Sequence, residues 1–298
     1  MSRTGWQYYL ARGISKLICQ FSYERIIAWG RKLGPLGEKI LHKQRERGIR
    51  HIMQGLACTQ KEAETIIAAV FANLGQSLLE ILYTPQLCKE NIHTFVTLEH
   101  EERLQQALDK NKGVIVLTAH FGNWEWMGAA LSLYGYPTTT IVKNQPNDQL
   151  TRLLNEYRRM MGLEVFERGG NAMIIAARAL RRKKILGFLA DQDGGEDGVP
   201  DEFLGKFASS PKGPAQFYCK FGSPIVPIFA IHDEQHHHRV LIGKEIAYEP
   251  TGDTTKDIAE VTRLLTAETA RLIQTYPAEW LWFQHRWRTQ QASMHTES

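Results

Sequence analysis

Short apolar runs rich in β-branched residues alternate along the chain with segments of helical periodicity. The runs lie at 95–98, 114–119, 138–142, 163–166, 185–190 and 224–231, and a polar turn then leads into 239–243 as an edge hairpin. Helices are expected near 100–110, 124–135, 147–161, 171–183, 211–221 and 255–275. Such alternation favours right-handed βαβ units. We therefore expect an α/β fold with a largely parallel central sheet flanked by helices.

The first 55 residues follow a different pattern. Apolar residues recur at helical spacing from Leu10 to Phe21, with Trp6 before them and the basic Arg12 and Lys16 between them. A basic amphipathic helix with aromatic residues at one end is typical of a membrane interface, so we favour in-plane attachment. Packing on the rest of the chain is the alternative, and the two are compatible. We expect a membrane-associating helical segment at 1–55, an α/β domain at 56–290 and a loose tail at 291–298.

A capping box marks the start of a further helix. Thr59 and Glu62 have the required spacing, and the helix they open is expected to run towards Leu82. Nothing in the chain resembles the apolar core of a secretory signal, and we find no uninterrupted apolar run near the length of a membrane span.

Composition limits the classes of partner. The 36 basic and 32 acidic residues give a net charge of +4, which is too small to indicate nucleic acid but is compatible with an anionic membrane surface or a phosphorylated substrate. The four cysteines contain no CxxC pair, which is typical of incidental thiols in a reducing compartment.

Four polar clusters directly follow predicted strands. They are His120 with Asn123 and Glu125, the segment 143–148 with Asn144, the segment 167–170 with Arg168, and the segment 191–195 with Asp191 and Asp193. Ligands of open α/β sheets bind at the carboxyl ends of strands. One crevice is therefore expected to collect all four clusters, with Asn123, Asn144, Arg168, Asp191 and Asp193 as substrate-binding candidates.

The first cluster predicts general-base chemistry. His120 ends a strand and Glu125 lies in the first turn of the next helix, so a tight turn is expected to bring the two within hydrogen-bonding distance. A carboxylate that holds an imidazole in one tautomer makes the ring a better proton acceptor. The simplest use is to take a proton from an alcohol that attacks an activated acyl group. Arg168 is interpreted as a clamp on a phosphate or an acyl-carrier arm, with an exposed cation at a helix start as the alternative.

The sequence gives little support for metal binding, nucleotide binding or a covalent acyl-enzyme. Asp191 and Asp193 alternate as ligands of a hard cation do, but without companion ligands we favour a loop-stabilising, hydrogen-bonding role and expect no metal. His236, His237 and His238 are interpreted as a solvated turn, and His285 as a packing histidine. The chain has no GxSxG elbow, no P-loop and no GxGxxG motif, so direct attack by an acceptor hydroxyl without an acyl-enzyme is preferred.

At this point the residues resemble a known family. The block HFGNWE at 120–125 is similar to the HX4D/E block of the bacterial late acyltransferases of lipid A biosynthesis. Further similar segments follow in collinear order at 142–158, 166–180, 189–198, 203–215 and 276–290, with Arg168 on the family's arginine. The likeness extends from about residue 90 to 290. The opening segment departs from the family because Arg12, Lys16 and Glu24 interrupt the stretch where many members carry a transmembrane helix.

The resemblance implies a glycerol-phosphate-acyltransferase-like fold and an acyl thioester of acyl carrier protein or coenzyme A as donor. It also implies a lipid A precursor or related membrane glycolipid as acceptor, a place on the cytoplasmic face of the bacterial inner membrane, and no metal or organic cofactor. In this reading His120 is the base and Glu125 fixes the ring. Backbone N–H groups from Gly122 to Trp124, or the Asn123 amide, steady the oxyanion, and Trp124, Trp126 and Met127 line an acyl slot or are plain core. A different lipid or mannosylated acceptor, and an inactive lipid-binding protein, stay open.

Overall fold

The computed structural model describes residues 5–143, 149–168 and 172–289. The helices are α1 (Trp6–Ile18), α2 (Tyr23–Ile40), α3 (His42–Leu56), α4 (Gln60–Tyr83), α5 (Glu101–Asp109), α6 (Trp124–Leu133), α7 (Gln149–Met160), α8 (Ala172–Arg181), α9 (Gly213–Phe221) and α10 (Thr254–Thr275). The strands are β1 (Val96–Glu99), β2 (Val114–Thr118), β3 (Thr138–Lys143), β4 (Glu164–Arg168), β5 (Ile185–Leu189), β6 (Val199–Phe203), β7 (Lys206–Ser210), β8 (Ile225–His232) and β9 (His238–Ile242).

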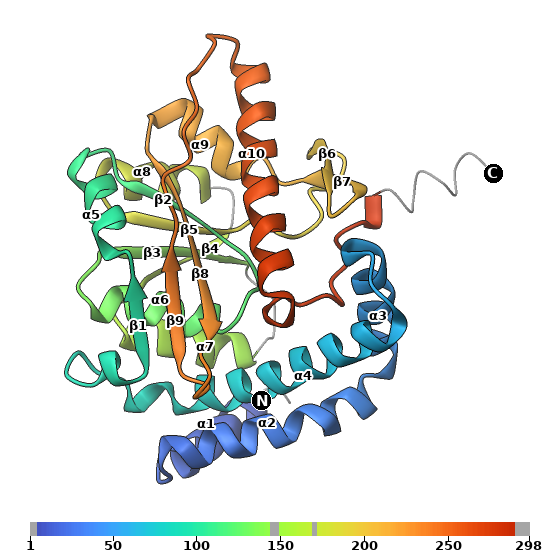
Figure 1. Ribbon diagram of the computed structural model, residues 1–298. Coiled ribbons are helices and arrows are strands. Elements are labelled where there is room, and N and C mark those ends of the chain that lie inside the picture. Colours follow the sequence, from blue (N-terminus) through green and yellow to red (C-terminus); the bar gives the residue numbers. More distant parts are fainter. Residues whose placement is uncertain (1–4, 144–148, 169–171, 290–298) are drawn as a thin grey trace.

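Seven of the nine described strands form one sheet in the order β1-β9-β8-β2-β5-β3-β4 (Figure 1). The five strands from β8 to β4 are mutually parallel, which confirms the expected α/β fold with a largely parallel sheet. The predicted hairpin β8–β9 is present and antiparallel. Its expected place at the sheet edge is wrong, because β1 pairs in parallel with β9 and forms the edge itself.

Alternate residues of the strands face two helical layers. In β2, Val114 and Val116 pack in the cluster that contains α5 and α6, whereas Ile115 and Leu117 pack in the cluster that contains α8, α9 and α10. All four side chains are buried. A strand covered on both faces reads as a continuous apolar run, which is why the sequence predicted β2 so clearly. Figure 1 shows α10 crossing the face of the sheet opposite to α6.

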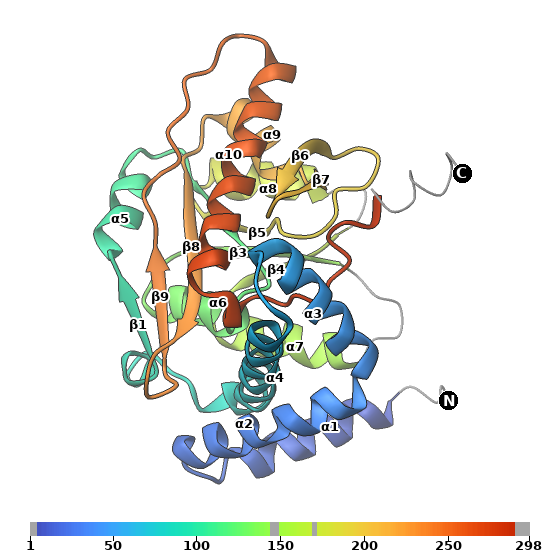
Figure 2. The ribbon, with the colours of Figure 1, turned by 45° about the vertical axis from the view of Figure 1, so that its right-hand side comes forward.

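The N-terminal helices pack on the α/β unit through α4, which lies beside α2 in both views (Figure 2). The predicted capping box is formed, because Thr59 Oγ1 accepts from the Glu62 backbone N–H and the Glu62 carboxylate accepts from the Thr59 N–H. Glycines allow α2 and α4 to approach closely: a Cβ atom on Gly75 would lie 2.3 Å from the carbonyl oxygen of Gly30. Helix α1 contacts α7, where Tyr8 Oη donates to Glu156 at 2.5 Å.

Two features differ from the sequence expectations. The helical stretch 60–86 is long and apolar enough to cross a membrane by length and composition, although α4 contributes Ile67 and Phe71 to the core. In addition, β6 and β7 form an unexpected antiparallel hairpin. Leu204 and Gly205 in its turn both have positive φ, 52° and 72°, and leucine rarely adopts that conformation, so the usual Asn-Gly signal is missing.

Candidate active site

The segment between β2 and α6 is a tight turn held from two sides. Gly122 has φ +55° and lies so close to β8 that an added Cβ atom would be 2.2 Å from the carbonyl oxygen of Ala230. Its N–H donates to the Glu279 carbonyl at 2.8 Å, and the Leu281 N–H donates to the His120 carbonyl at 3.2 Å. The C-terminal segment around 279–281 therefore fixes the backbone on which His120 is mounted.

The partner of the His120 ring is Asp191. His120 Nδ1 lies 2.9 Å from Asp191 Oδ1, and the His120 backbone N–H donates to Asp191 Oδ2 at 3.0 Å. Strand register explains the pairing. Thr118 at the end of β2 is aligned with Leu189 at the end of β5, and each functional residue follows two positions later. The carboxyl ends of two adjacent parallel strands thus deliver the imidazole and the carboxylate to the same point.

Asp191 is held as a buried anion. Its side chain is 0% exposed, and Oδ2 also accepts from Trp280 Nε1 at 2.8 Å and Gln284 Nε2 at 2.9 Å. Burial alone would raise the pKa of Asp191, but the charge of His120 and the three donor side chains lower it to about 2. An ionised Asp191 requires a proton on His120 Nδ1, which leaves the Nε2 lone pair available.

His120 keeps access to the surface. Its side chain is 22% exposed, and within the described residues Nε2 has no hydrogen-bond partner. Burial lowers the pKa of the ring, but the charge and hydrogen bond of Asp191, with a smaller contribution from the charge of Glu125, raise the pKa overall. The Trp124 ring packs edge-on against the imidazole with centroids 5.1 Å apart. The arrangement presents a proton acceptor whose charged form is stabilised.

The expected hydrogen bond between His120 and Glu125 is not formed, and that prediction is corrected. Glu125 binds Arg158 of α7 instead, in a bidentate pair with Nε–Oε2 at 2.8 Å and Nη2–Oε1 at 2.5 Å. Trp124 Nε1 also donates to Glu125, at 3.1 Å. A guanidinium matches a carboxylate at two points, whereas an imidazole offers one, so the bidentate pair wins. Glu125 acts on His120 only through its charge.

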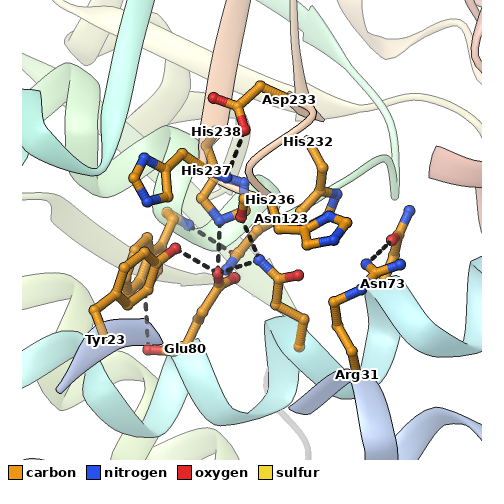
Figure 3. A network of polar contacts seen from close by, with 12 residues as sticks. Tyr23, Arg31, Asn73, Glu80, Asn123, His232, Asp233, His236, His237 and His238 are labelled. Carbon is orange, nitrogen blue, oxygen red and sulfur yellow. Dashed lines mark hydrogen bonds and ion pairs between the residues drawn. The ribbon is translucent and has the colours of Figure 1, made fainter. Parts of the chain in front are cut away.

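Asn123 is a structural cap rather than an open amide. Its Oδ1 accepts from the Trp126 N–H at 3.0 Å and so caps α6, while Nδ2 donates to Glu80 Oε2 at 2.8 Å (Figure 3). The residue is buried, so the expectation that its amide binds substrate is wrong. Trp126 and Met127 are also buried. Of the two interpretations given for them, an acyl slot or plain core, the core therefore applies. Because the Gly122 N–H is engaged as well, the backbone N–H groups of Trp124 and Glu125 are the remaining candidates for oxyanion donors at the start of α6.

The other candidates are Asp193, Arg168 and Asn144. Asp193 binds Thr289 and the Gly195 N–H through its carboxylate, which agrees with a loop-stabilising role. Arg168 is the last residue of β4, and its backbone lies beside Lys143 at the end of β3, on the same edge of the sheet as His120 and Asp191. Its side chain, like all of Asn144, lies outside the described residues.

The histidines set aside from the sequence have mixed outcomes. His236 and His237 lie in the turn between β8 and β9, as expected. His238 does not: it begins β9, is buried, and its Nε2 lies 2.9 Å from Glu80 Oε1. The interpretation of His238 as a solvated turn residue is therefore wrong. His285 is exposed rather than packed, and its Nε2 lies 2.8 Å from Arg47 Nη1.

A pocket adjoins this region between α6 and α7. Glu125 and Arg158 form part of its wall, and His120 is not among its lining residues. The apolar part of the wall consists of Ile81, Ala129, Leu154, Met161 and Leu163.

Three residues that hold the carboxylates of the site were not predicted from the sequence. They are Trp280, Gln284 and Arg158. The equal spacing of His120 and Asp191 beyond their strands was a usable signal, but only once β2 and β5 are known to be neighbours. Trp280 and Gln284 lie about 90 positions from Asp191, so no local pattern connects them.

Comparisons with known proteins place the sequence among acyltransferases. The family model described as bacterial lipid A biosynthesis acyltransferase matches residues 3–289. A phosphatidylinositol mannoside acyltransferase of Mycolicibacterium smegmatis is 28% identical over 228 residues, which cover 75% of this chain and 73% of the relative. A lipid A biosynthesis palmitoleoyltransferase of Escherichia coli is 24% identical over 292 residues, covering 95% and 92%. A lipid A biosynthesis acyltransferase of Haemophilus influenzae is 22% identical over 265 residues, covering 86% and 80%.

The family model spans nearly the whole chain, and all three relatives carry the name of an acyltransferase. The chain therefore belongs to the bacterial lipid A biosynthesis acyltransferase family.

Proposed function

We propose that this protein transfers a fatty acyl chain from a thioester of acyl carrier protein or coenzyme A to a hydroxyl of a lipid A precursor or related membrane glycolipid. The observation that carries the proposal is the His120–Asp191 pair at the carboxyl ends of β2 and β5, with Nδ1 bound and Nε2 unpaired within the described residues. A base of this kind suits removal of a proton from an alcohol.

The reaction balances without a covalent enzyme intermediate. His120 Nε2 takes the proton of the acceptor hydroxyl as its oxygen attacks the thioester carbonyl, and Asp191 stabilises the resulting imidazolium. The tetrahedral intermediate then breaks its carbon–sulfur bond, and the leaving thiolate takes the proton from Nε2. The positive end of α6 begins at Trp124, beside the imidazole, and the backbone N–H groups of Trp124 and Glu125 are suited to stabilise the oxyanion.

Charged residues around His120 have two further roles, which are phosphate binding and stabilisation of the base. Arg168 binds phosphate on the donor or the acceptor; its support is the position of its backbone at the same sheet edge as Asp191. The bidentate Glu125–Arg158 pair fixes α7 against the start of α6, and the Glu125 charge helps to raise the pKa of His120. Glu125 therefore assists the base at a distance instead of orienting it.

Attachment to a membrane surface is supported by α1 and α2, and the cytoplasmic face of the inner membrane is the surface that we propose. Although both helices pack on the fold, each also carries large apolar side chains that are exposed. They are Trp6, Tyr9, Leu10, Ile14, Leu17, Trp29, Leu33, Leu36 and Ile40. Basic residues, including Lys16 and Lys32, lie on the same two helices. Apolar and basic side chains on helices at one end of the fold suit in-plane binding to anionic lipid.

A second acceptor class is favoured by one observation. The relative named as a phosphatidylinositol mannoside acyltransferase has the higher identity of the three, 28% against 24% and 22%. A mannosylated glycolipid is therefore kept as the alternative acceptor.

Mass spectrometry of membrane lipids tests the proposal and separates the acceptors. Lipids are compared from cells that express the wild type, His120→Gln or no protein. We expect one lipid species to gain the mass of one acyl chain with the wild type only, and fragmentation to place the chain on a lipid A precursor. A gain on a mannosylated lipid would select the alternative. Identical lipid profiles, with the protein folded and the candidate acceptors present, would reject acyl transfer.

A further inference from the structure

A second polar cluster lies near the turn between β2 and α6 that carries His120. It is buried between α2, α4 and the hairpin β8–β9 (Figure 3). At its centre the Glu80 carboxylate is 0% exposed and accepts hydrogen bonds from Tyr23 Oη at 2.7 Å and Gln76 Nε2 at 2.8 Å. His238 Nε2 lies 2.9 Å from the same oxygen. Because the cluster is buried in the core, binding of an acyl-transfer substrate does not explain it.

Two histidines in this cluster have the same incomplete pattern. His232 Nδ1 lies 2.9 Å from Glu279 Oε2, and His238 Nε2 lies 2.9 Å from Glu80 Oε1. The side chains are 4% and 1% exposed. The opposite nitrogens, His232 Nε2 and His238 Nδ1, are buried and have no hydrogen-bond partner among the described residues. His232, with Nδ1 on the Glu279 carboxylate and Nε2 free, has the arrangement found around metal-ligating histidines, whereas His238 presents Nε2 directly to the Glu80 oxygen.

A third unpartnered acceptor belongs to the same network. Gln76 Nε2 donates to Glu80, and within the described part of the chain Gln76 Oε1 has no donor. Protonation does not resolve this pattern at His232, because a proton on its Nε2 would replace an unpaired acceptor by an unpaired donor. A buried polar atom without a partner destabilises the folded state. A cation satisfies nitrogen and oxygen lone pairs together.

The distances suit one ion. One donor atom from each of Glu80, His232 and His238 lies within 4.8 Å of the others, and the His232 and His238 ring centroids are 4.7 Å apart. A tetrahedral ion with bonds of about 2.0–2.1 Å spaces its ligand atoms roughly 3.4 Å apart, so His232 Nε2, His238 Nε2 and a Glu80 oxygen can reach one ion with small shifts. Imidazole nitrogens with a carboxylate oxygen select a divalent first-row transition metal such as Zn²⁺ rather than Ca²⁺ or Mg²⁺.

We propose that Glu80, His232 and His238 form a structural binding site for one divalent transition-metal ion. The site joins α4 to both strands of the β8–β9 hairpin. Through the Asn123 Nδ2 contact with Glu80 it also supports the residue that caps α6 next to His120. The proposal does not depend on the acyl transfer reaction, and its test does not measure activity.

The test uses full-length protein that carries no polyhistidine tag. Metal-free protein is titrated with Co²⁺ and Zn²⁺, with visible absorption of bound Co²⁺ and mass-spectrometric metal analysis as readouts. We expect saturation at one ion per chain and a rise in melting temperature. In His232→Gln and His238→Gln the affinity should fall at least about 100-fold, while His51→Gln, whose ring binds the Trp282 carbonyl outside the cluster, should keep it.

Glu279→Gln keeps the test decisive if the ligand variants do not fold. It removes only the carboxylate behind His232 Nδ1, so the affinity should fall about 10- to 100-fold with the fold retained. Absence of saturable binding at one ion per chain in the wild type would overturn the proposal. So would equal affinity in the wild type and in a folded His232→Gln protein.

Discussion

Asp191→Asn is the most informative single change at the active site, because it alters one atom of a group that substrate does not reach. Oδ2 accepts from three donors, the His120 N–H, Trp280 Nε1 and Gln284 Nε2, whereas among the described residues Oδ1 accepts only from His120 Nδ1. The single oxygen of the amide therefore stays in the Oδ2 position. Its NH₂ group then faces His120 Nδ1, which must become an acceptor, and the ring proton moves to Nε2.

The consequence is loss of the base without loss of the fold. With Nε2 protonated, His120 cannot accept the hydroxyl proton, and general-base removal costs roughly 10²–10⁴-fold in rate. KM should change little, because the Asp191 side chain is 0% exposed. The buried hydrogen bonds weaken as the charge is lost, so unfolding should become easier by about 1–3 kcal/mol.

The assay measures thiol release from an acyl-carrier-protein thioester in the presence of the lipid acceptor. Asp257→Asn is the matched control: Asp257 is also buried, accepts from Tyr248 Oη and Thr251, and lies on α10 away from His120. This control should keep kcat. An Asp191→Asn enzyme with unchanged kcat, or with a raised KM and normal kcat, would refute the orienting role and restore a substrate-binding role for Asp191.

Three further predictions follow from the same geometry. The pKa of His120 is raised from 6.5, so kcat/KM of the wild type should fall as the pH drops through a value above 6.5, and Asp191→Asn should shift this limb to lower pH; a limb that does not move would exclude the pair as its origin. Gly122→Ala should destabilise the protein by about 1–3 kcal/mol or more, because φ is +55° and its Cβ would lie 2.2 Å from a carbonyl oxygen, and a melting temperature equal to wild type would contradict the turn geometry. Replacing the exposed Trp6 and Leu17 by Ser should weaken sedimentation with anionic vesicles without lowering the melting temperature, and equal binding would remove these side chains from the membrane contact.

Much of the fold was readable because its signals are local. The apolar run of β2 is buried on both faces, and the capping box at Thr59 fixes the start of α4. The β6–β7 hairpin was missed because its turn uses Leu204 at φ 52°. The edge position of β9 was wrong because only tertiary pairing places β1 outside it.

The site shows the same division between local and non-local information. His120 was identified from its place at a strand end, which is a local property. Its acid was assigned to Glu125, five residues away, but a strand-pair register brings Asp191 from 71 residues away. Glu125 was unavailable because Arg158, on a helix that follows two elements later, offers two hydrogen bonds in place of one. Sequence spacing alone does not tell which strand ends are neighbours.

The central claim is that the Nε2 atom of His120 accepts the hydroxyl proton. Single-turnover acyl transfer by His120→Gln tests it most directly, because the glutamine amide can still donate to Asp191 and leaves no unpaired buried carboxylate. The account predicts a rate at least about 10²-fold below wild type, with the circular dichroism spectrum unchanged. A folded variant that transfers the acyl chain within a few-fold of the wild-type rate would contradict it.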